Sequence, residues 1–213
     1  MEVDPSKIHL IPMGINPDDW EDVDGGRFRR KHGLEGRKIL LFAGTKDYNK
    51  GAIHLLQAVK KMDQDRKDAT LVAMGLATEG WERNKRRIGE INLLDLGYVS
   101  EREKRDAFAA CDLFVMPSRY DSFGIVYLEA WKCGKPVIGA RVGAIPEVIE
   151  EGKDGLLVEF GNIDQLASSL VHLLDQPALC REMGETGRKK VIERYNWHTN
   201  IAMIEKVYEQ VRP

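Results

Sequence analysis

The stretch Lys38-Ile39-Leu40-Leu41-Phe42-Ala43 is followed directly by the polar loop Gly44-Thr45-Lys46-Asp47-Tyr48-Asn49-Lys50-Gly51. A continuous apolar run of this length predicts a β-strand that is buried on both faces, as the strands of parallel sheets are. Beyond the loop, apolar residues recur at the spacing of an amphipathic helix: Leu55, Leu56, Val59 and Met62. A buried strand, a polar loop and a helix in this order are typical of a parallel α/β fold.

The same unit repeats along the chain. Further strands are predicted at Ala69 to Met74, Leu93 to Leu96, Leu113 to Met116, Pro136 to Ala140 and Gly155 to Val158. Two intervening helices carry capping signals, with Ser100 three residues before Glu103 and Asn162 three residues before Gln165. Because crossovers between parallel strands are right-handed, these six strands predict a doubly wound, Rossmann-like parallel sheet with helices on both faces.

The chain divides into three predicted segments. Residues 1–37 contain several prolines and glycines and a short basic helix, Arg27 to His32, and they predict a connection rather than part of a core. Residues 38–196 form the Rossmann-like domain. Residues 197–213 predict a C-terminal helix, Trp197 to Arg212, with one apolar stripe that we expect to dock against another surface: Ile201, Ile204, Tyr208 and Val211.

Composition excludes several classes of protein. The 213 residues include 32 Lys and Arg and 34 Asp and Glu, so a net charge of -2 creates no overall attraction to nucleic acid or an anionic membrane. The longest apolar stretch, Ile39 to Ala43, is far shorter than the roughly 20 residues that cross a bilayer. The start, Met1-Glu2-Val3-Asp4, is acidic where a signal peptide is basic, so we expect a cytoplasmic protein.

Neither the cysteines nor the histidines indicate a metal site. Cys111, Cys133 and Cys180 are odd in number and far apart, and we interpret them as small apolar residues of the interior. The five histidines lack a metal-binding spacing such as H-E-x-x-H. The basic residues from Arg83 to Arg87 are interpreted as a solvated helix face rather than a nucleic-acid patch.

Two common nucleotide-binding motifs are absent. No two glycines are separated by a single residue, which excludes the dinucleotide fingerprint G-x-G-x-x-G. The P-loop pattern G-x-x-x-x-G-K-[ST] fails on the first loop, because Asn49 stands where its second glycine belongs and Gly51 where its hydroxyl belongs. The loops that follow the strands nevertheless remain the expected ligand side of a doubly wound sheet.

A second polar loop begins at Pro117, after the fourth predicted strand. Ser122 is suited to cap a helix that begins near Phe123, and the free amides and dipole of that helix end would bind an anion. Gly124 would let a phosphate approach the backbone closely. Lys50 of the first loop could add a mobile positive charge to the same anion, or it could be an ordinary solvated lysine.

Glu129 follows on the same predicted helix, within an otherwise apolar face. A carboxylate in such a place is costly unless it has a hydrogen-bonding partner. Two interpretations remain open at this point. Glu129 binds a sugar diol, or it pairs internally with another group of the protein.

Seven motifs occur in an order that is similar to a known family: Ile11-Pro12-Met13-Gly14-Ile15-Asn16, the loop Gly44 to Gly51, Leu96-Gly97-Tyr98-Val99-Ser100, Pro117 to Ala130, Gly134-Lys135-Pro136-Val137-Ile138, Val142-Gly143-Ala144-Ile145-Pro146-Glu147 and Gly155-Leu156-Leu157-Val158. Together they resemble the donor-binding C-terminal half of family-4 retaining glycosyltransferases with the GT-B fold. The resemblance covers nearly the whole chain, and seven motifs in register are more specific than any one of them.

The resemblance implies a nucleotide-diphospho-sugar that lies across the strand ends and a reaction that requires no metal ion. Lys50 matches the lysine that contacts the diphosphate, Glu129 matches the acid that holds the ribose hydroxyls, and Asp121 offers a carboxylate to the transferred sugar. Lys50 and Asp121 are therefore the expected catalytic residues. The other expected donor contacts are Gly44, Thr45 and Lys46 of the first loop, Tyr98 and Val99 beside the base, and Ser122, Phe123, Gly124 and Ile125 at the helix start.

The chain departs from the family pattern at several positions. The paired acids lie eight positions apart, and Asp121 is one methylene shorter than the usual glutamate, which leaves the identity of the sugar open. Thr45 stands where the family usually has arginine, so the diphosphate loses a charge-assisted bond of about 1.5 to 3 kcal/mol unless Lys46 compensates. Met13 and Ala144 replace a usual asparagine and a usual glycine, and we expect both to be tolerated.

In the GT-B architecture the acceptor is bound largely by an N-terminal domain, and this chain resembles the other half. The resemblance implies that residues 1–37 are an interdomain connection and that the C-terminal helix returns toward the absent domain. A glycan or lipid-linked acceptor would be held by that domain or by a separate subunit, with peripheral membrane contact at most. Three interpretations stay open: the donor half of a glycosyltransferase, a non-catalytic nucleotide-sugar-binding module, and a related epimerase or phosphorylase.

Overall fold

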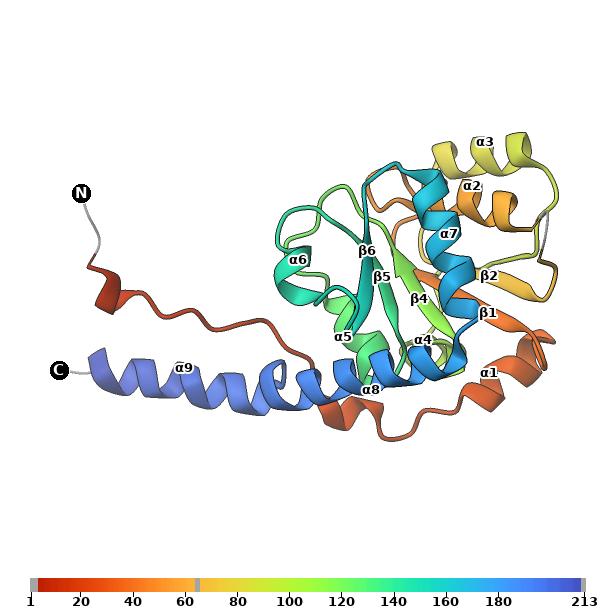
Figure 1. The fold of residues 1–213 in the computed structure, drawn as a ribbon. Coiled ribbons are helices and arrows are strands. Elements are labelled where there is room, and N and C mark those ends of the chain that lie inside the picture. Colours follow the sequence, from red (N-terminus) through yellow and green to blue (C-terminus); the bar gives the residue numbers. More distant parts are fainter. Residues whose placement is uncertain (1–3, 64–65, 212–213) are drawn as a thin grey trace.

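The computed structural model of the chain describes residues 4–63 and 66–211 (Figure 1). The acidic start over Met1 to Val3 and the helix end expected at Arg212 lie outside the described residues. One parallel sheet lies between two layers of helices, and residues 4–12 and the last helix extend away from this body on the same side (Figure 1).

The sheet has six strands in the order β3-β2-β1-β4-β5-β6, and every neighbouring pair is parallel. This confirms the predicted doubly wound, Rossmann-like fold, in which the strand order reverses between β1 and β4. In the register of these central strands, Leu40 pairs with Leu71 on one side and with Leu113 on the other. The strands are β1 (Lys38–Ala43), β2 (Ala69–Met74), β3 (Leu93–Asp95), β4 (Leu113–Met116), β5 (Val137–Ala140) and β6 (Gly155–Val158).

Helices cover both faces of the sheet. The layer of α2, α3 and α7 packs on one face, and α1, α4, α5 and α8 pack with one another on the opposite face (Figure 1). The α-helices are α1 (Gly25–His32), α2 (Ala52–Met62), α3 (Glu79–Ile88), α4 (Glu101–Ala110), α5 (Ile125–Lys132), α6 (Ile145–Val148), α7 (Ile163–Leu174), α8 (Pro177–Arg194) and α9 (Trp197–Val211), preceded by the short 3-10 helices Pro5–Lys7 and Pro17–Trp20.

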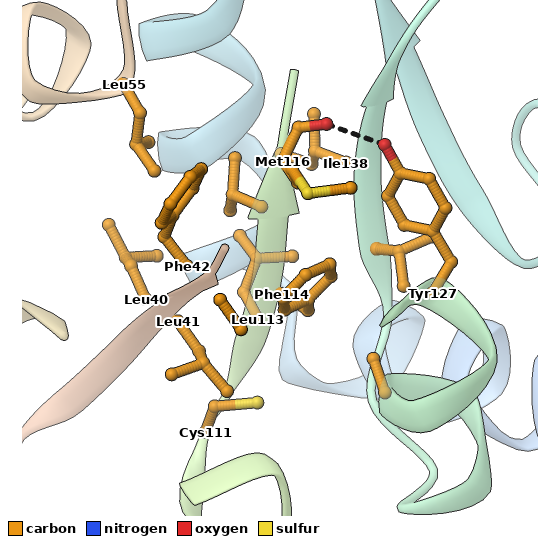
Figure 2. Packing of buried hydrophobic residues seen from close by; sticks show 14 of the residues in the cluster. Leu40, Leu41, Phe42, Leu55, Cys111, Leu113, Phe114, Met116, Tyr127 and Ile138 are labelled. Atoms are coloured by element: carbon orange, nitrogen blue, oxygen red, sulfur yellow. Dashed lines mark hydrogen bonds between the residues drawn. The ribbon is translucent and has the colours of Figure 1, made fainter. Parts of the chain in front are cut away.

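The core lies between the central strands and the helices packed on them. Leu40 and Leu41 of β1 and Phe114 of β4 are fully buried there (Figure 2). Tyr127 of α5 is also buried, and its hydroxyl donates a 2.6 Å hydrogen bond to the backbone oxygen of Met116 at the end of β4 (Figure 2). This bond ties the first turn of α5 to the loop that follows β4.

Two of the three predicted helix caps are confirmed. Ser100 accepts a hydrogen bond from the amide of Glu103, and Asn162 accepts one from the amide of Gln165. The predicted cap at Ser122 is wrong, because α5 begins at Ile125 and its N-cap residue is Gly124, at φ 78°. Gly124 thus has a left-handed backbone conformation, which glycine adopts without strain, and it leads the chain into α5 without a capping side chain.

The N-terminal segment contributes to the core, which differs from the prediction of a mere connection. Ile15, Trp20, Phe28 and Leu34 are all buried. The ring of Trp20 meets that of Phe108 on α4 edge-on, with 5.8 Å between centroids. The sequence did not predict their burial, because these apolar residues are isolated among turns and do not recur at the spacing of a helix or a strand.

Residues 4–12 and α9 form an arm that leaves the body. Its base is fastened by hydrogen bonds from the amide of Ile15 to the oxygen of Tyr195, from the amide of Trp197 to the oxygen of Ile15, and from the side chain of Asn200 to the oxygen of Pro12. In the predicted apolar stripe of α9, Ile201 is 48% and Tyr208 66% exposed, and Ile204 is half-buried. Within residues 4–63 and 66–211, no helix combines the length and the apolar character needed to span a membrane.

Candidate functional site

The loop after β1 presents Lys50 at the carboxyl end of the sheet. Asp47 accepts a 2.7 Å hydrogen bond from the amide of Lys50, and its own carbonyl accepts one from Ala52, so the loop turns tightly into α2. Gly51 is the N-cap residue of α2 at φ 74°, and its Cα lies directly against the backbone oxygen of Pro117 in the loop after β4. The two loops that sequence analysis singled out are therefore in contact at Gly51.

Replacing Gly51 with alanine should lower the free energy of unfolding by about 2 to 4 kcal/mol, because it adds left-handed backbone strain to a steric clash. A Cβ at this position would lie 2.1 Å from the oxygen of Pro117. Gly36→Ala is the matched control, since Gly36 has φ 73° but an added Cβ would meet no described atom within 4 Å. Urea unfolding of both variants checks this, and equal losses would contradict a constraint from the contact with Pro117.

Lys46 is not brought to the cleft, which corrects the expectation that it contributes to donor binding. Its ammonium donates 2.6 Å hydrogen bonds to Asp95 Oδ1 and to the backbone oxygen of Leu96, and the residue is only 1% exposed. The physical reason is that the chain continues to pair beyond β1, with the amide of Lys46 bonded to the oxygen of Leu76, which directs the side chain under β3. Lys46 therefore does not replace the charge that is missing at Thr45.

The carboxylate of Asp95 receives Lys46 inside the protein. Burial raises its pKa, but hydrogen bonds from Lys46, Lys85 and the Trp81 indole outweigh burial and hold the pKa below its ordinary value. The Asp95 carboxyl is thus ionised at neutral pH. The pair fastens the first loop to β3. The ammonium of Lys46 is therefore occupied by Asp95.

The loop after β4 brings Asp121 against Lys50. The Lys50 ammonium lies 2.9 Å from Asp121 Oδ2, and Asp121 Oδ1 accepts a 3.2 Å hydrogen bond from the amide of Phe123. The helix α5 starts directly after Gly124, and no side chain of the described residues caps it. The Asp121 carboxylate therefore links the ammonium of one loop to the segment just before α5, although 71 positions separate Lys50 from Asp121.

These groups line a cleft of about 1060 Å³ at the carboxyl ends of β1 and β4. A cleft at the point where strand order reverses is the usual ligand site of such sheets. The cleft is also lined by residues of the arm and its base: Met13, Tyr195, Asn200 and Met203. The predicted site residues on its surface are Gly44, Thr45, Lys50, Asp121, Ser122, Phe123, Gly124 and Ile125.

A second cavity of about 340 Å³ adjoins the cleft over the end of β1, where both are lined by Gly44 and Thr45. It contains the remaining predicted residues, Tyr98, Val99 and Glu129. All the predicted site residues except Lys46 therefore line one of two neighbouring hollows. Lys50 and Asp121, which are in contact, come from different loops, so only the fold brings them together.

Glu129 has an internal partner and an unused oxygen. Its Oε1 lies 2.8 Å from the ammonium of Lys104 on α4, and its Oε2 is buried and has no hydrogen-bond partner among the described residues. Burial raises the pKa of Glu129, and the positive charge of Lys104 opposes that rise. Internal pairing is thus confirmed for one oxygen of Glu129, and the other is buried and unpaired among the described residues.

Sequence reasoning missed Lys104, which lines the smaller cavity beside Glu129. The capping signal at Ser100 correctly placed Lys104 in a helix, but no spacing rule relates residues on two helices that are separated by a strand. It also missed Asn200, which is 1% exposed and lines the large cleft from the base of α9.

No group of three or more His, Cys, Asp or Glu side chains suited to a metal ion occurs in residues 4–63 and 66–211. The interpretation of Cys111 as an apolar interior residue is confirmed, since it is 1% exposed and burial raises the pKa of its thiol to about 12. Cys133 and Cys180 are partly buried and free.

A six-stranded doubly wound parallel sheet with a cleft at its point of reversal defines the Rossmann-like α/β class, whose members bind ligands at that edge of the sheet. The chain belongs to the glycosyl transferases group 1 family, whose sequence profile matches residues 25–190. The architecture is that of the C-terminal half of a GT-B fold, as the resemblance implied.

Individual relatives agree with this family. The chain is 29% identical over 213 residues to the MMP alpha-(1->4)-mannosyltransferase of Mycolicibacterium hassiacum, covering 98% of this chain and 49% of the relative. It is 33% identical over 192 residues to the N-acetyl-alpha-D-glucosaminyl L-malate synthase of Bacillus anthracis, covering 88% of this chain and 50% of the relative. The chain thus spans about half the length of these relatives.

A solved structure shows the same fold. The structure of Anabaena Alr3699/HepE in complex with UDP superposes with a TM-score of 0.86 at 22% sequence identity, covering 95% of this chain and 57% of that one.

Proposed function

We propose that this chain binds a nucleotide-diphospho-sugar and forms the donor half of a retaining, metal-independent glycosyltransferase. The observation that carries the proposal is that Lys50 and the uncapped amino end of α5 line the same cleft. A helix amino end and a nearby ammonium are together suited to a diphosphate. Group 1 membership and the UDP bound to the related fold support the same ligand class.

In this proposal, the diphosphate lies between Lys50 and the first amides of α5. Gly124 serves the turn into the helix, because the space that a side chain there would need is filled by the Tyr127 ring. When the bond from the sugar to the diphosphate breaks, negative charge grows on the departing phosphate oxygen. An ammonium and fixed amide dipoles stabilise that charge more strongly than they stabilise the bound donor. In this way, the ammonium and the amides stabilise the departing diphosphate without a metal ion.

Asp121 would contact the sugar only after a change of partners. In the structure both of its carboxylate oxygens are engaged, one by Lys50 and the other by the amide of Phe123. If Lys50 turns toward a bound diphosphate, Asp121 Oδ2 becomes free to accept a sugar hydroxyl. Donor binding and exposure of the sugar-binding oxygen are then coupled through Lys50.

The smaller cavity would hold the nucleoside. Tyr98 and Val99 lie beside it, and Glu129 is the acid that faces the ribose hydroxyls in this arrangement. The acceptor, a glycan or a lipid-linked sugar, would be held by a domain or subunit outside this chain, acting in the cytoplasm. The exposed apolar residues of the arm are suited to contact that partner.

Titrating ADP, GDP and UDP into the purified chain tests the proposal. At least one of them should bind with a dissociation constant in the micromolar to millimolar range, because binding would require only that Lys50 change partners within a cleft that is already open. The same affinity is expected in EDTA and in magnesium chloride. Absence of binding of all three nucleotides at millimolar concentration would overturn the donor site, and binding only with magnesium would overturn metal independence.

One observation favours a second candidate, a nucleotide-sugar-binding module without transferase activity. Thr45 brings no charge to the cleft, and Lys46 is buried against Asp95. Slow release of free sugar from an added nucleotide-diphospho-sugar would favour the enzyme, because leaving-group stabilisation also accelerates transfer to water. Tight binding of the intact donor without any release would favour the module.

A further inference from the structure

Lys104 stands between two carboxylates at the edge of the smaller cavity. Its ammonium lies 2.8 Å from Glu129 Oε1 and 3.4 Å from Glu101 Oε2, and all three residues line the cavity. The side chain of Glu101 is 69% exposed, whereas that of Glu129 is 10% exposed. The bond to Glu129 is therefore the one that is sheltered from water.

We propose that Lys104 is a positioning residue that makes this site selective for ribose hydroxyls. By occupying Oε1 of Glu129, it orients the carboxylate and leaves Oε2 as the oxygen that accepts a hydroxyl of the nucleoside. The inference rests on the proposed nucleotide site and names the residue that determines its selectivity.

The buried oxygen is the first support for this role. Glu129 Oε2 is buried and has no hydrogen-bond partner among the described residues, although its neighbour Oε1 is paired. Buried acceptors without partners are rare in folded proteins, and each calls for an explanation. A ligand hydroxyl supplies the missing donor, and the adjoining cavity of about 340 Å³ has room for a nucleoside.

The surrounding charges give the second support. The charged groups near Glu129 are Lys104, Glu101 and Arg105 of α4, and the Cys133 thiol lies nearby at the end of α5. Burial raises the pKa of Glu129, while Lys104 is the strongest opposing influence. Without Lys104, burial and Glu101 would act together, so Glu129 would remain protonated to higher pH.

The protonation state decides how well a hydroxyl is recognised. A carboxylate accepts a hydroxyl hydrogen bond about twice as strongly as a neutral acid does. Because Glu129 is ionised above its pKa, ribose selectivity should be present at high pH and lost as pH falls through that value. Replacing Lys104 by a neutral residue should move this loss to higher pH.

Calorimetric titration of the purified chain tests this role. The probes are ADP, GDP and UDP and their 2′,3′-dideoxy counterparts, measured from pH 6 to pH 9. The unmodified chain should bind its preferred ribonucleotide about tenfold or more tightly than the dideoxy form at neutral pH. In Lys104→Met this ratio should fall to about two at neutral pH and recover as the pH is raised.

Three further variants separate positioning from a structural role. Lys104→Arg keeps the charge and should keep most of the selectivity, whereas Glu129→Gln should lose it with Lys104 still present. Arg102→Met removes a cation from the same helix, where the side chain is 67% exposed, and should leave the ratio unchanged. Circular dichroism and the thermal unfolding midpoint establish that each variant is folded.

The outcomes distinguish this inference from the proposed function. If the unmodified chain prefers ribonucleotides and Lys104→Met retains the same preference and pH profile, the role of Lys104 is refuted while the donor site stands. If Lys104→Met binds the ribonucleotide and the dideoxynucleotide more weakly by the same factor, the role of Lys104 is refuted as well. Absence of binding of any nucleoside diphosphate to the unmodified chain would instead refute the donor site, and this inference with it.

Discussion

Lys50→Met should weaken the binding of a nucleoside diphosphate about 10- to 100-fold and leave the binding of the corresponding nucleoside unchanged. A charge-assisted contact to phosphate contributes about 1.5 to 3 kcal/mol, which corresponds to this range. The upper part of the range is expected because removing Lys50 also leaves Asp121 without its 2.9 Å ion pair, so that a carboxylate faces the incoming anion. Calorimetric titration with the diphosphate and the nucleoside measures both effects.

Lys61→Met is the matched control for this substitution. Lys61 lies near the end of α2, the helix that follows the Lys50 loop, and its side chain is 55% exposed and pairs with Asp164. Lys61→Met should leave the affinity for the nucleoside diphosphate unchanged. Adding Asp121→Asn to Lys50→Met should recover part of the lost affinity by removing the unpaired charge. Equal diphosphate affinity of the unmodified chain and Lys50→Met would contradict the proposed contact.

Asp154→Ala should lower the free energy of unfolding by about 3 kcal/mol. Asp154 is fully buried after β5, where it pairs with Lys190 of α8 and accepts a 2.9 Å hydrogen bond from the amide of Glu150. Removing one partner of a buried pair leaves the other charge uncompensated, and this is among the costliest single changes in a protein interior. Guanidinium chloride unfolding followed by circular dichroism measures the loss.

The exposed pair of Glu185 and Arg188 provides the control. Both side chains are 45% exposed, so Glu185→Ala should cause no measurable change in stability. Exposed pairs are compensated by water when one partner is removed, which is why the two substitutions should differ. Similar unfolding midpoints for Asp154→Ala and the unmodified chain would show that the ammonium of Lys190 reaches water without cost.

The Asp154 pair also supports the helix that forms the candidate anion site. The Trp131 indole of α5 donates a 2.8 Å hydrogen bond to the backbone oxygen of Asp154, and the Lys190 ammonium lies 5.1 Å from the centroid of the Trp131 ring. These contacts hold the carboxyl end of α5 against β6 and α8. We therefore expect Asp154→Ala to weaken nucleotide binding as well, through the position of α5.

Much of the architecture could be predicted from the sequence. Apolar runs such as those at Leu40 and Phe114 identified every strand of the sheet, because strands covered on both faces must be apolar throughout. The caps at Ser100 and Asn162 were recognised because a cap depends only on residues within one turn. The buried contribution of Trp20 and Phe28 could not be recognised, since isolated apolar residues leave no periodic signal.

The candidate site could be predicted in part. Lys50 and Glu129 were predicted from loops and a helix that a doubly wound sheet places at one edge, whereas Asp121 was predicted only through the family resemblance. The direction of a side chain is decided by distant partners, and this is where prediction was wrong for Lys46. Its ammonium is drawn to Asp95, which lies 49 positions further along the chain.

By itself, the sequence determined the parallel α/β class, the strand positions and the edge of the sheet where a ligand is expected, because these depend on local periodicity and on general rules of chain connection. Only the tertiary structure decided that Lys50 meets Asp121, that Lys46 is withdrawn and that Lys104 holds one oxygen of Glu129. Charged side chains pair over a few ångströms with whichever element packs nearby. Their partners are therefore set by the packing of strands and helices that lie far apart in the chain.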